Sequence, residues 1–276
     1  MIVGPTASGK SSLAIELAEK FYGELICADS RTIYKAMDIG TAKPSQADQQ
    51  KVPHHMIDIV QPSQPFSAAQ FKRSATIWIE DIAIRGKLPI LVGGTGLYVD
   101  SVIYDYAFLP PGSRDEREQL ESLSIEQLQQ KLKDRNISLP ENEKNKRHLI
   151  RKIETNGAVP VKKAMRQNTL VIGIDKTKEE LTSTIKQRTK KMIDDGLESE
   201  VKRLAEAYGW DSPGMQSVGY REWRSGDSLQ EIAQNIEKNT LHYAKRQRTW
   251  FKRNPNIVWV KNSAEAGAQV RKFLQK

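Results

Sequence analysis

The stretch GPTASGKS, residues 4–11, decides the fold of this chain. It fits the phosphate-loop (P-loop) pattern GxxxxGK[ST], between a short apolar run and a helical stripe that begins at Leu13. Its glycines let backbone N–H groups turn toward a phosphate, and the following helix adds its positive dipole end. We expect Lys10 to neutralise phosphate charge and Ser11 to ligate Mg²⁺, the predicted cofactor. The predicted loop consists of Gly4, Pro5, Thr6, Ala7, Ser8, Gly9, Lys10 and Ser11.

Strand-like and helical segments alternate along most of the chain. Ser67 and Gln70 have capping-box spacing and open a helix that Gly86 ends. The other expected helices are residues 181–208, interrupted at Gly196, residues 228–252 and a short C-terminal helix. The expected strands are residues 1–3, 24–28, 56–60, 88–92, 169–174 and 257–260. This alternation predicts an α/β fold with a P-loop NTPase-like core, in which helices flank a parallel sheet.

The pattern changes near Pro110. From there to about Asn168 the sequence is polar and helical without a convincing strand, although strand-bearing segments lie on both sides. We therefore expect an all-helical subdomain, residues 110–167, inserted into a catalytic core of residues 1–109 and 168–276. The C-terminal part of this core carries a basic helix.

The composition fits a globular protein with a polyanionic partner. Of its 276 residues, 38% are hydrophobic and 28% charged, and the formal net charge of +9 attracts nucleic acid or acidic lipid. No apolar run approaches the roughly 20 residues of a membrane-spanning helix, and the P-loop stands where a leader peptide would, so we expect a cytoplasmic location. The single Cys27 lies in an apolar run and is predicted to pack in a buried strand.

Asp29 and the pair His54–His55 are the polar candidates close to predicted strands. Asp29 follows the strand at 24–28, and the carboxyl end of a parallel strand points into the crevice where ligands bind. Its carboxylate could hold Mg²⁺ through water, accept a proton from a nucleophile, or cap a turn. No further His or Cys stands at metal-ligand spacing from His54 and His55, which favours a structural, hydrogen-bonding pair.

Seven blocks of the sequence carry a family resemblance. They are GPTASGKS (4–11), ADSRTIYKAMDIGTAKP (28–44), VPHHMIDI (52–59), FSAAQF (66–71), ILVGGTGLY (90–98), SVGYREW (217–223) and YAKRQRTWFKR (243–253). In this order they resemble the tRNA dimethylallyltransferases, which place a prenyl group on N6 of adenine 37 beside the anticodon. The combination of GTAKP, VGGTGLY and AKRQ-x-TWF on one P-loop is highly specific, and the blocks cover most of the chain.

The resemblance implies an activity: transfer of a dimethylallyl group from dimethylallyl diphosphate to that N6 in the anticodon stem-loop of tRNA, with release of diphosphate, by a monomer. The implied diphosphate site is Thr6, Ala7, Ser8, Gly9, Lys10 and Ser11, with Mg²⁺ on Ser11. The implied catalytic residues are Asp29 as general base, Lys10, and Arg188 as a diphosphate clamp. The implied tRNA contacts are Asp29, Ser30, Arg31, Thr32, Thr95, Arg147, His148, Arg151, Gln216, Ser217, Val218, Gly219, Tyr220, Arg221, Lys245, Arg246, Gln247, Arg248, Trp250 and Lys252.

Charge on two predicted helices agrees with an RNA partner. At helical periodicity, one arc of the C-terminal basic helix holds Lys245, Arg246, Arg248, Lys252 and Arg253. Tyr243, Trp250 and Phe251 fall opposite and are expected to pack. A second cluster, in the insertion, consists of Lys144, Lys146, Arg147, Arg151 and Lys152, beside an apolar edge of Leu149, Ile150 and Ile153. Two separate basic helices favour a grip on RNA over merely solvated surfaces.

Two other functions stay open on the sequence. A small-molecule or nucleotide kinase would bind ATP in the same loop, with Asp29 activating a hydroxyl and 114–117 as an arginine-bearing lid. An RNA-binding adaptor with an inactive loop would bind tRNA and turn over nothing. The chain also departs from the family, which usually has arginines at the positions of His242 and Thr184 and a longer insertion, so we expect two anion contacts to be weakened.

Overall fold

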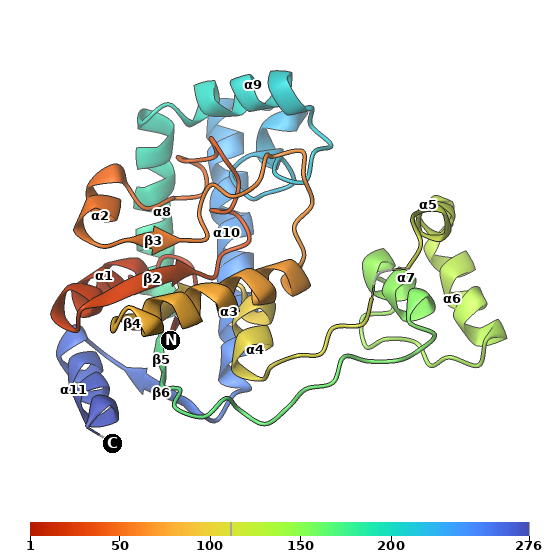
Figure 1. Ribbon diagram of the computed structural model, residues 1–276. Coiled ribbons are helices and arrows are strands. Elements are labelled where there is room, and N and C mark those ends of the chain that lie inside the picture. The colour runs from red at the N-terminus through yellow and green to blue at the C-terminus, as the bar shows by residue number, and fades with distance from the viewer. Residues whose placement is uncertain (111, 276) are drawn as a thin grey trace. The chain divides into compact units, whose positions relative to one another are not determined.

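Figure 1 shows the computed structural model of this chain, which describes residues 1–110 and 112–275. Pro111 and Lys276, which the predicted domain ranges include, lie outside the described residues. The chain divides into two compact units, one of Met1–Ile103 with Met165–Lys276 and one of Tyr104–Ala164.

The larger unit is built on a six-stranded sheet in the order β3-β2-β4-β1-β5-β6, and every neighbouring pair is parallel. The strands are β1 (Ile2–Val3), β2 (Gly23–Cys27), β3 (His54–His55), β4 (Leu88–Gly93), β5 (Val171–Ile174) and β6 (Ile257–Val260). Parallel strands covered on both faces need apolar runs, which residues 88–92 of β4 and 25–27 of β2 supply, while the buried Glu24 of β2 is paired with Arg85 and Lys87. The predicted α/β core is confirmed, and the P-loop leaves the sheet at its centre because β1 lies between β4 and β5.

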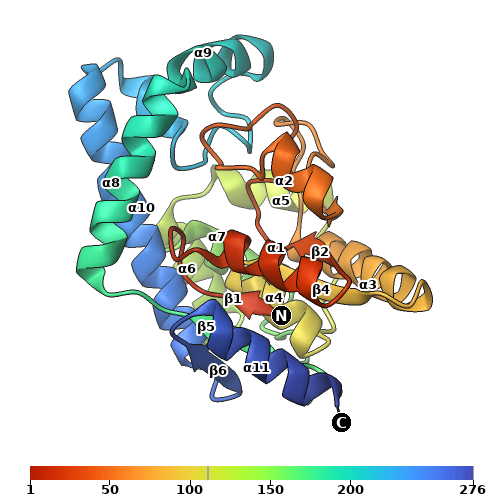
Figure 2. The same ribbon diagram turned by 90° about the vertical axis from the view of Figure 1, so that its left-hand side faces the viewer.

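Helices cover both faces of this sheet. The helices of the larger unit are α1 (Lys10–Lys20), α2 (Gln46–Lys51), α3 (Ala68–Ile84), α4 (Gly96–Ile103), α8 (Lys178–Asp194), α9 (Leu197–Tyr208), α10 (Leu229–Lys252), α11 (Ser263–Leu274) and a 3-10 helix at Arg221–Ser225. Figures 1 and 2 show α1 and α11 on one side of the sheet and α3 and α4 on the other. Leu13 and Leu17 of α1 pack with Val270 of α11 against the strands. The rings of Phe71 and Tyr98 stack 4.2 Å apart between α3 and α4.

The predicted start of α3 is confirmed at the level of single hydrogen bonds. Oγ of Ser67 accepts the N–H of Gln70, and the Gln70 side chain accepts the N–H of Ser67, which completes the capping box. The break at Gly196 separates α8 from α9, as predicted. The helices α2 and α4 were not predicted, because one is short and polar and the other begins inside a glycine turn.

The strand predicted at 56–60 is wrong. The observed strand β3 is His54–His55, and the chain then leaves the extended conformation because Met56 and Asp58 have left-handed φ values of 66° and 53°. Val60 makes only an isolated bridge to Tyr34. The apolar residues of 56–60 therefore belong to a loop, which buries Met56 but leaves Ile59 38% exposed.

The smaller unit contains α5 (Arg114–Ser122), α6 (Ile125–Asp134) and α7 (Lys146–Glu154). Its core is the cluster of Leu120, Leu128, Leu132, Leu149, Ile150 and Ile153. The apolar edge predicted for the basic helix is thus buried, and an isolated bridge pairs Ala107 with Val161. This unit runs over residues 104–164, whereas the sequence placed the insertion at 110–167.

Two predictions from composition can be compared with the structure. Within residues 1–110 and 112–275, no helix has the length and apolar character needed to cross a membrane. Cys27 is buried in β2, and burial raises the pKa of its thiol to about 12, so its predicted packing role is confirmed.

Candidate active site at the phosphate loop

The P-loop joins β1 to α1 and leaves the start of the helix open. Gly9 has a φ of 92°, in the left-handed region that glycine adopts without strain, and α1 begins directly after it at Lys10. No side chain of the described residues caps this helix, so its first N–H groups stay available to a ligand. Such a helix start binds a phosphate anion.

Two cations meet at this loop. Nζ of Lys10 donates to the carbonyl of Pro5 (2.9 Å), and burial lowers its pKa to about 8, although Asp29 acts in the opposite direction. Arg188 reaches the loop from α8 and donates from Nη2 to Oγ1 of Thr6 (3.1 Å), and burial also lowers the pKa of its guanidinium. The positive charge of Arg188 lowers the pKa of Lys10 further, so an anion between them would relieve their repulsion.

A cavity of about 320 Å³, the P-loop cavity, opens against these groups. Its charged lining is Lys10, Lys176 and Arg188 with a single acid, Asp29, which favours an anionic ligand. The predicted diphosphate residues that line it are Thr6, Ala7, Gly9, Lys10 and Ser11. Ser8 does not line it: the Ser8 side chain is buried, and its Oγ has no hydrogen-bond partner among the described residues.

A second cavity of about 170 Å³, the α8–α10 cavity, lies beside the first. The two share four lining residues, Thr6, Asp29, Thr41 and Arg188, so they adjoin at Asp29. The other cations of this cavity are Arg31, Arg221 and Arg246. A continuous lining therefore leads from Lys10, past Asp29, to the arginines of α10 and the 3-10 helix.

Asp29 stands where the two cavities meet. Its Oδ1 accepts the N–H of Arg31 (2.8 Å), so the carboxylate does cap a turn, as one of its three open roles required. The N–H of Ser30, between Asp29 and Arg31, donates to Oγ1 of Thr95 (3.0 Å). This bond ties the Asp29 loop to the turn after β4. The cap occupies one carboxylate oxygen and leaves chemistry open to the other.

A buried carboxylate holds the outer wall of the α8–α10 cavity. Glu200 of α9 accepts the backbone N–H groups of Asp38, Ile39 and Gly40, at 3.0 to 3.2 Å. It also accepts the hydroxyl of Tyr220 (2.6 Å), whose pKa burial raises strongly. Because these bonds join the segment 38–41 to 216–221, one acid fixes two loops that line the cavity.

The predicted tRNA contacts fall into two groups in the larger unit. Exposed positions include Gln216, Arg221, Lys245, Arg246 and Lys252. The buried side chains are Thr32, Ser217, Tyr220 and Gln247, with exposed fractions of 6%, 1%, 0% and 4%. Their hydrogen-bonding atoms face the protein interior, as in the bond from Oγ of Ser217 to the carbonyl of Gly214. Sequence blocks mark these positions together, but the four buried side chains are withdrawn from the surface that a macromolecule can touch.

The predicted faces of α10 are confirmed only in part. Phe251 is buried, but Trp250 is 37% exposed and donates from Nε1 to Asp100 of α4 (3.1 Å). Arg248 is bound to Asp175 (2.9 Å), and Nζ of Lys252 lies 3.5 Å from the same carboxylate, so both are less available than Lys245 and Arg246. Trp250 lies at the margin between the apolar and basic faces of α10. Helical periodicity predicted that it would pack and did not reveal its exposure.

In the smaller unit, Arg147 and His148 are exposed on α7. Arg151 is not free: its guanidinium donates to the carbonyls of Leu109 and Pro110 and to Glu154. The arginines of the segment 114–117 are also paired, with glutamates of this unit. The exposed basic surface of α7 is therefore smaller than its sequence indicates.

Two lining residues, Lys176 and Thr41, were missed in the sequence. Lys176 is the second residue after the end of β5, and Thr41 lies in a loop shared by both cavities. Thr184, at a position where the family usually has arginine, also lines the P-loop cavity, and its hydroxyl donates to the carbonyl of Glu180. A lysine at the carboxyl end of a predicted strand was the available signal for Lys176.

His54 and His55 are the structural pair that the sequence predicted. Nδ1 of His54 lies 2.7 Å from the carbonyl of Val52, and Nε2 of His55 lies 2.7 Å from Glu24. The His55 ring stacks on Trp78 at 3.9 Å. Among the described residues, no group of three or more His, Cys, Asp or Glu side chains could hold a metal ion.

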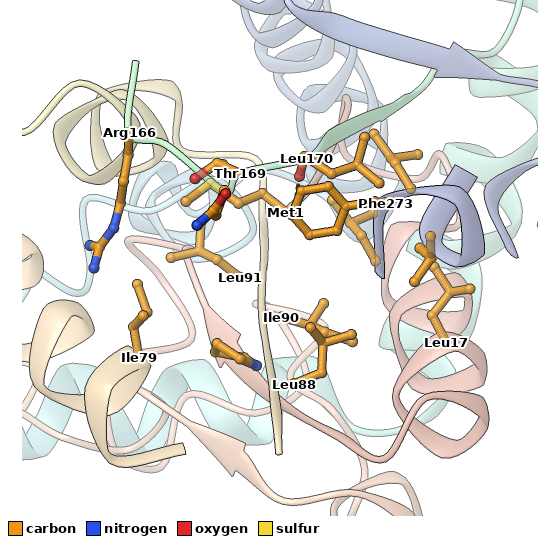
Figure 3. A pocket seen from close by; sticks show the side chains of 15 residues that line it. Met1, Leu17, Ile79, Leu88, Ile90, Leu91, Arg166, Thr169, Leu170 and Phe273 are labelled. Atoms are coloured by element: carbon orange, nitrogen blue, oxygen red, sulfur yellow. Dashed lines mark hydrogen bonds between the residues drawn. The ribbon is translucent and has the colours of Figure 1, made fainter. Parts of the chain in front are cut away.

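Another cavity, shown in Figure 3, lies at the opposite ends of the strands. Apolar side chains such as Leu88, Ile90 and Phe273 surround it. Among the described residues that line it, Arg166 alone has a charged side chain. It is lined by none of the predicted site residues. We therefore place the candidate active site at the P-loop.

The fold and this site define a P-loop protein whose anion cavity opens toward a basic surface. Comparison with known proteins gives the family. The family model described as IPP transferase matches residues 32–254. The tRNA dimethylallyltransferase of Anoxybacillus flavithermus is 40% identical over 275 residues, which covers 94% of this chain and 88% of the relative. That of Acetivibrio thermocellus is 39% identical over 298 residues, covering 100% and 95%.

Solved structures agree with these relatives. The full-length tRNA isopentenylpyrophosphate transferase from Bacillus halodurans has a TM-score of 0.76 and 34% identity, covering 99% of this chain and 94% of that chain. A eukaryotic dimethylallyltransferase acting on tRNA has a TM-score of 0.77 and 26% identity, covering 94% and 72%. The chain belongs to the IPP transferase family.

Proposed function

We propose that this protein transfers a dimethylallyl group from dimethylallyl diphosphate to N6 of adenine 37, next to the anticodon of tRNA, and releases diphosphate. The observation that carries the proposal is the meeting of the P-loop cavity and the α8–α10 cavity at Asp29. A leaving group held at Lys10 and a base entering past Arg221 and Arg246 would meet there. Relatives named as tRNA dimethylallyltransferases support the same reaction.

The P-loop side supplies stabilisation of the leaving group. The allylic C–O bond breaks, its electron pair goes to diphosphate, and the new C–N bond forms at N6. Lys10 and Arg188 are already in place for the departing anion, and preorganised charge is worth most where water is excluded. Lys176, which lines the same cavity, adds a third cation on this side.

The other side supplies orientation. An exocyclic amine is a weak nucleophile, so holding N6 in line with the allylic carbon contributes more than deprotonating it first. Asp29 accepts the proton that N6 loses, through the carboxylate oxygen that does not cap the turn. A loop base can be extruded from RNA at low cost and read at its edges inside the cavity.

Mg²⁺ is part of this proposal. Ser11 and Asp29 line one cavity. These oxygen donors suit Mg²⁺, which keeps waters and binds through few protein ligands together with substrate phosphates. When bound, the ion neutralises charge on the departing diphosphate, with Ser11 as its protein ligand.

The tRNA grip rests on exposed cations. Lys245, Arg246 and Lys252 of α10 would contact phosphates in the larger unit, and Arg147 of α7 would do so in the smaller unit. We expect the protein to act as a monomer. A tRNA substrate also agrees with the cytoplasmic location predicted above.

The test compares two donors. Purified protein is incubated with bulk tRNA and dimethylallyl diphosphate labelled in the allyl group, and separately with ATP labelled in the γ-phosphate. We expect label to enter RNA from the allylic donor only, at adenine 37. Transfer of the γ-phosphate would establish the kinase alternative, and tRNA binding without any transfer would establish the adaptor alternative.

A further inference from the structure

Gln247 is buried although its helix carries the exposed cations of the site. It is 4% exposed, between Arg246 and Arg248 on α10. The sequence placed it among the tRNA contacts, but in this structure its amide faces inward. Its role must therefore be sought in the bonds that it makes inside the protein.

The Gln247 amide bridges two loops. Its Oε1 accepts the N–H of Thr6 in the P-loop (2.7 Å), and its Nε2 donates to the carbonyl of Gly94 in the turn after β4 (2.9 Å). A single side chain thus ties three elements that lie far apart in the sequence.

Each of these loops holds one side of the reaction. Thr6 carries the hydroxyl that receives Arg188, so its backbone position sets the diphosphate grip. Thr95 receives the N–H of Ser30, the residue after Asp29. The path from the P-loop to the Asp29 loop therefore runs through Gln247, Gly94 and Thr95.

We propose that Gln247 is a positioning residue: its amide fixes the separation between the diphosphate grip and Asp29. The inference rests on the proposed function, because it gives that separation a catalytic meaning. Its effect falls on kcat, since reacting atoms that move apart by a fraction of an ångström lose rate without losing affinity. A tRNA contact would show the opposite pattern, a weaker tRNA complex at similar kcat.

Gly94 offers an independent way to disturb the same bridge. A Cβ added there would lie 2.1 Å from Nε2 of Gln247 and 3.1 Å from its Cδ, and the next atom, the carbonyl oxygen of Gly4, is 3.5 Å away. Gly94→Ala should therefore push the amide out of place. If Gln247 is first shortened to alanine, the added methyl group meets no obstacle.

The first experiment replaces the amide with an apolar side chain of similar length. Gln247→Met should lower kcat by about 10- to 100-fold, with the dissociation constant for tRNA within about twofold of the parent protein. The matched control is Gln234→Met, an exposed glutamine on the same helix, which should leave both values unchanged. A dissociation constant that rises as far as kcat falls, or kinetics equal to the control, would overturn the proposal.

The second experiment tests the bridge through non-additivity. Gly94→Ala alone should lower kcat like Gln247→Met, whereas the double variant with Gln247→Ala should be no slower than Gln247→Ala alone. Independent, multiplying losses would show that the two positions do not act through one contact.

Hydrogen exchange separates this proposal from the proposed function. Amides of 4–11 and 94–96 should exchange faster in Gln247→Met than in Gln234→Met, whether or not RNA is prenylated. Unchanged exchange in both segments would overturn the positioning role. A parent protein that transfers no label would instead count against the proposed function.

Discussion

The two sides of the candidate site hold their positive charge in different ways. Lys10 and Arg188 are half-buried, lie against the P-loop and have lowered pKa values because of that burial. Lys245 and Lys252 stand exposed on α10. A charge that has lost water interacts strongly with a nearby anion, whereas exposed charges are screened by salt. The first arrangement suits a small diphosphate in a fixed position, and the second suits a long polyanion.

The largest expected effect comes from the buried side. Lys10→Ala should lower kcat/KM for dimethylallyl diphosphate by about 10²- to 10³-fold, because it removes preorganised charge from the leaving group. Steady-state kinetics with saturating tRNA measures this, with the exposed Lys190→Ala on α8 as control. An unchanged kcat/KM would mean that the P-loop takes no part in the mechanism. The distinction between its buried cations and the exposed cations of α10 would then have no functional meaning.

The second-largest loss of activity is expected at Asp29, which lies where the two cavities meet. Asp29→Asn keeps an oxygen that can accept the N–H of Arg31, so the turn survives and only the proton acceptor is lost. We expect kcat to fall by about 100-fold, with little change in the affinity for tRNA measured by filter binding. Equal losses in kcat and affinity would contradict a proton-accepting role.

The lowered pKa of Lys10 predicts a pH effect on diphosphate binding. Below its pKa of about 8 the ammonium is present in the empty site, and above it the site must take up a proton to bind the anion. The affinity for inorganic diphosphate should therefore fall by up to about tenfold for each pH unit above 8. Calorimetry on the parent protein and on Lys10→Met measures this, and the variant should lack that dependence.

The smallest effects belong to the exposed side. Lys245→Gln should reduce the slope of log affinity for tRNA against log salt concentration by about one. Arg248→Gln and Lys252→Gln should each reduce it less, because both side chains already lie beside Asp175. Equal slopes in all variants would mean that α10 is a solvated surface. A large loss of kcat in Lys245→Gln would erase the distinction between the two sides.

Local sequence carried much of the fold. The P-loop, the capping box at Ser67 and the strand at 257–260 were predicted with nearly their observed bounds. Each is a short run whose spacing or residue type determines the backbone directly. The strand predicted at 56–60 is wrong because the apolar residues of this segment do not determine its backbone. Nothing in the residue types reveals the left-handed φ values at Met56 and Asp58.

The candidate site was predictable where its groups are contiguous. Lys10, Ser11 and Asp29 follow from one motif and one strand end. The family resemblance assigned Arg188 to the diphosphate, and the structure places it on Thr6. Resemblance could not separate exposed from buried members of a block, as Gln247 and Tyr220 show.

By itself, the sequence determined the phosphate loop, the parallel α/β core and the two basic helices, because these depend on neighbours within one turn or one strand. Only the tertiary structure decided that Glu200 gathers the segment 38–40, that Lys176 lines the P-loop cavity and that Gln247 joins Thr6 to Gly94. Those contacts join residues far apart in the chain, and their free energy depends on the burial of polar groups, which no local pattern encodes.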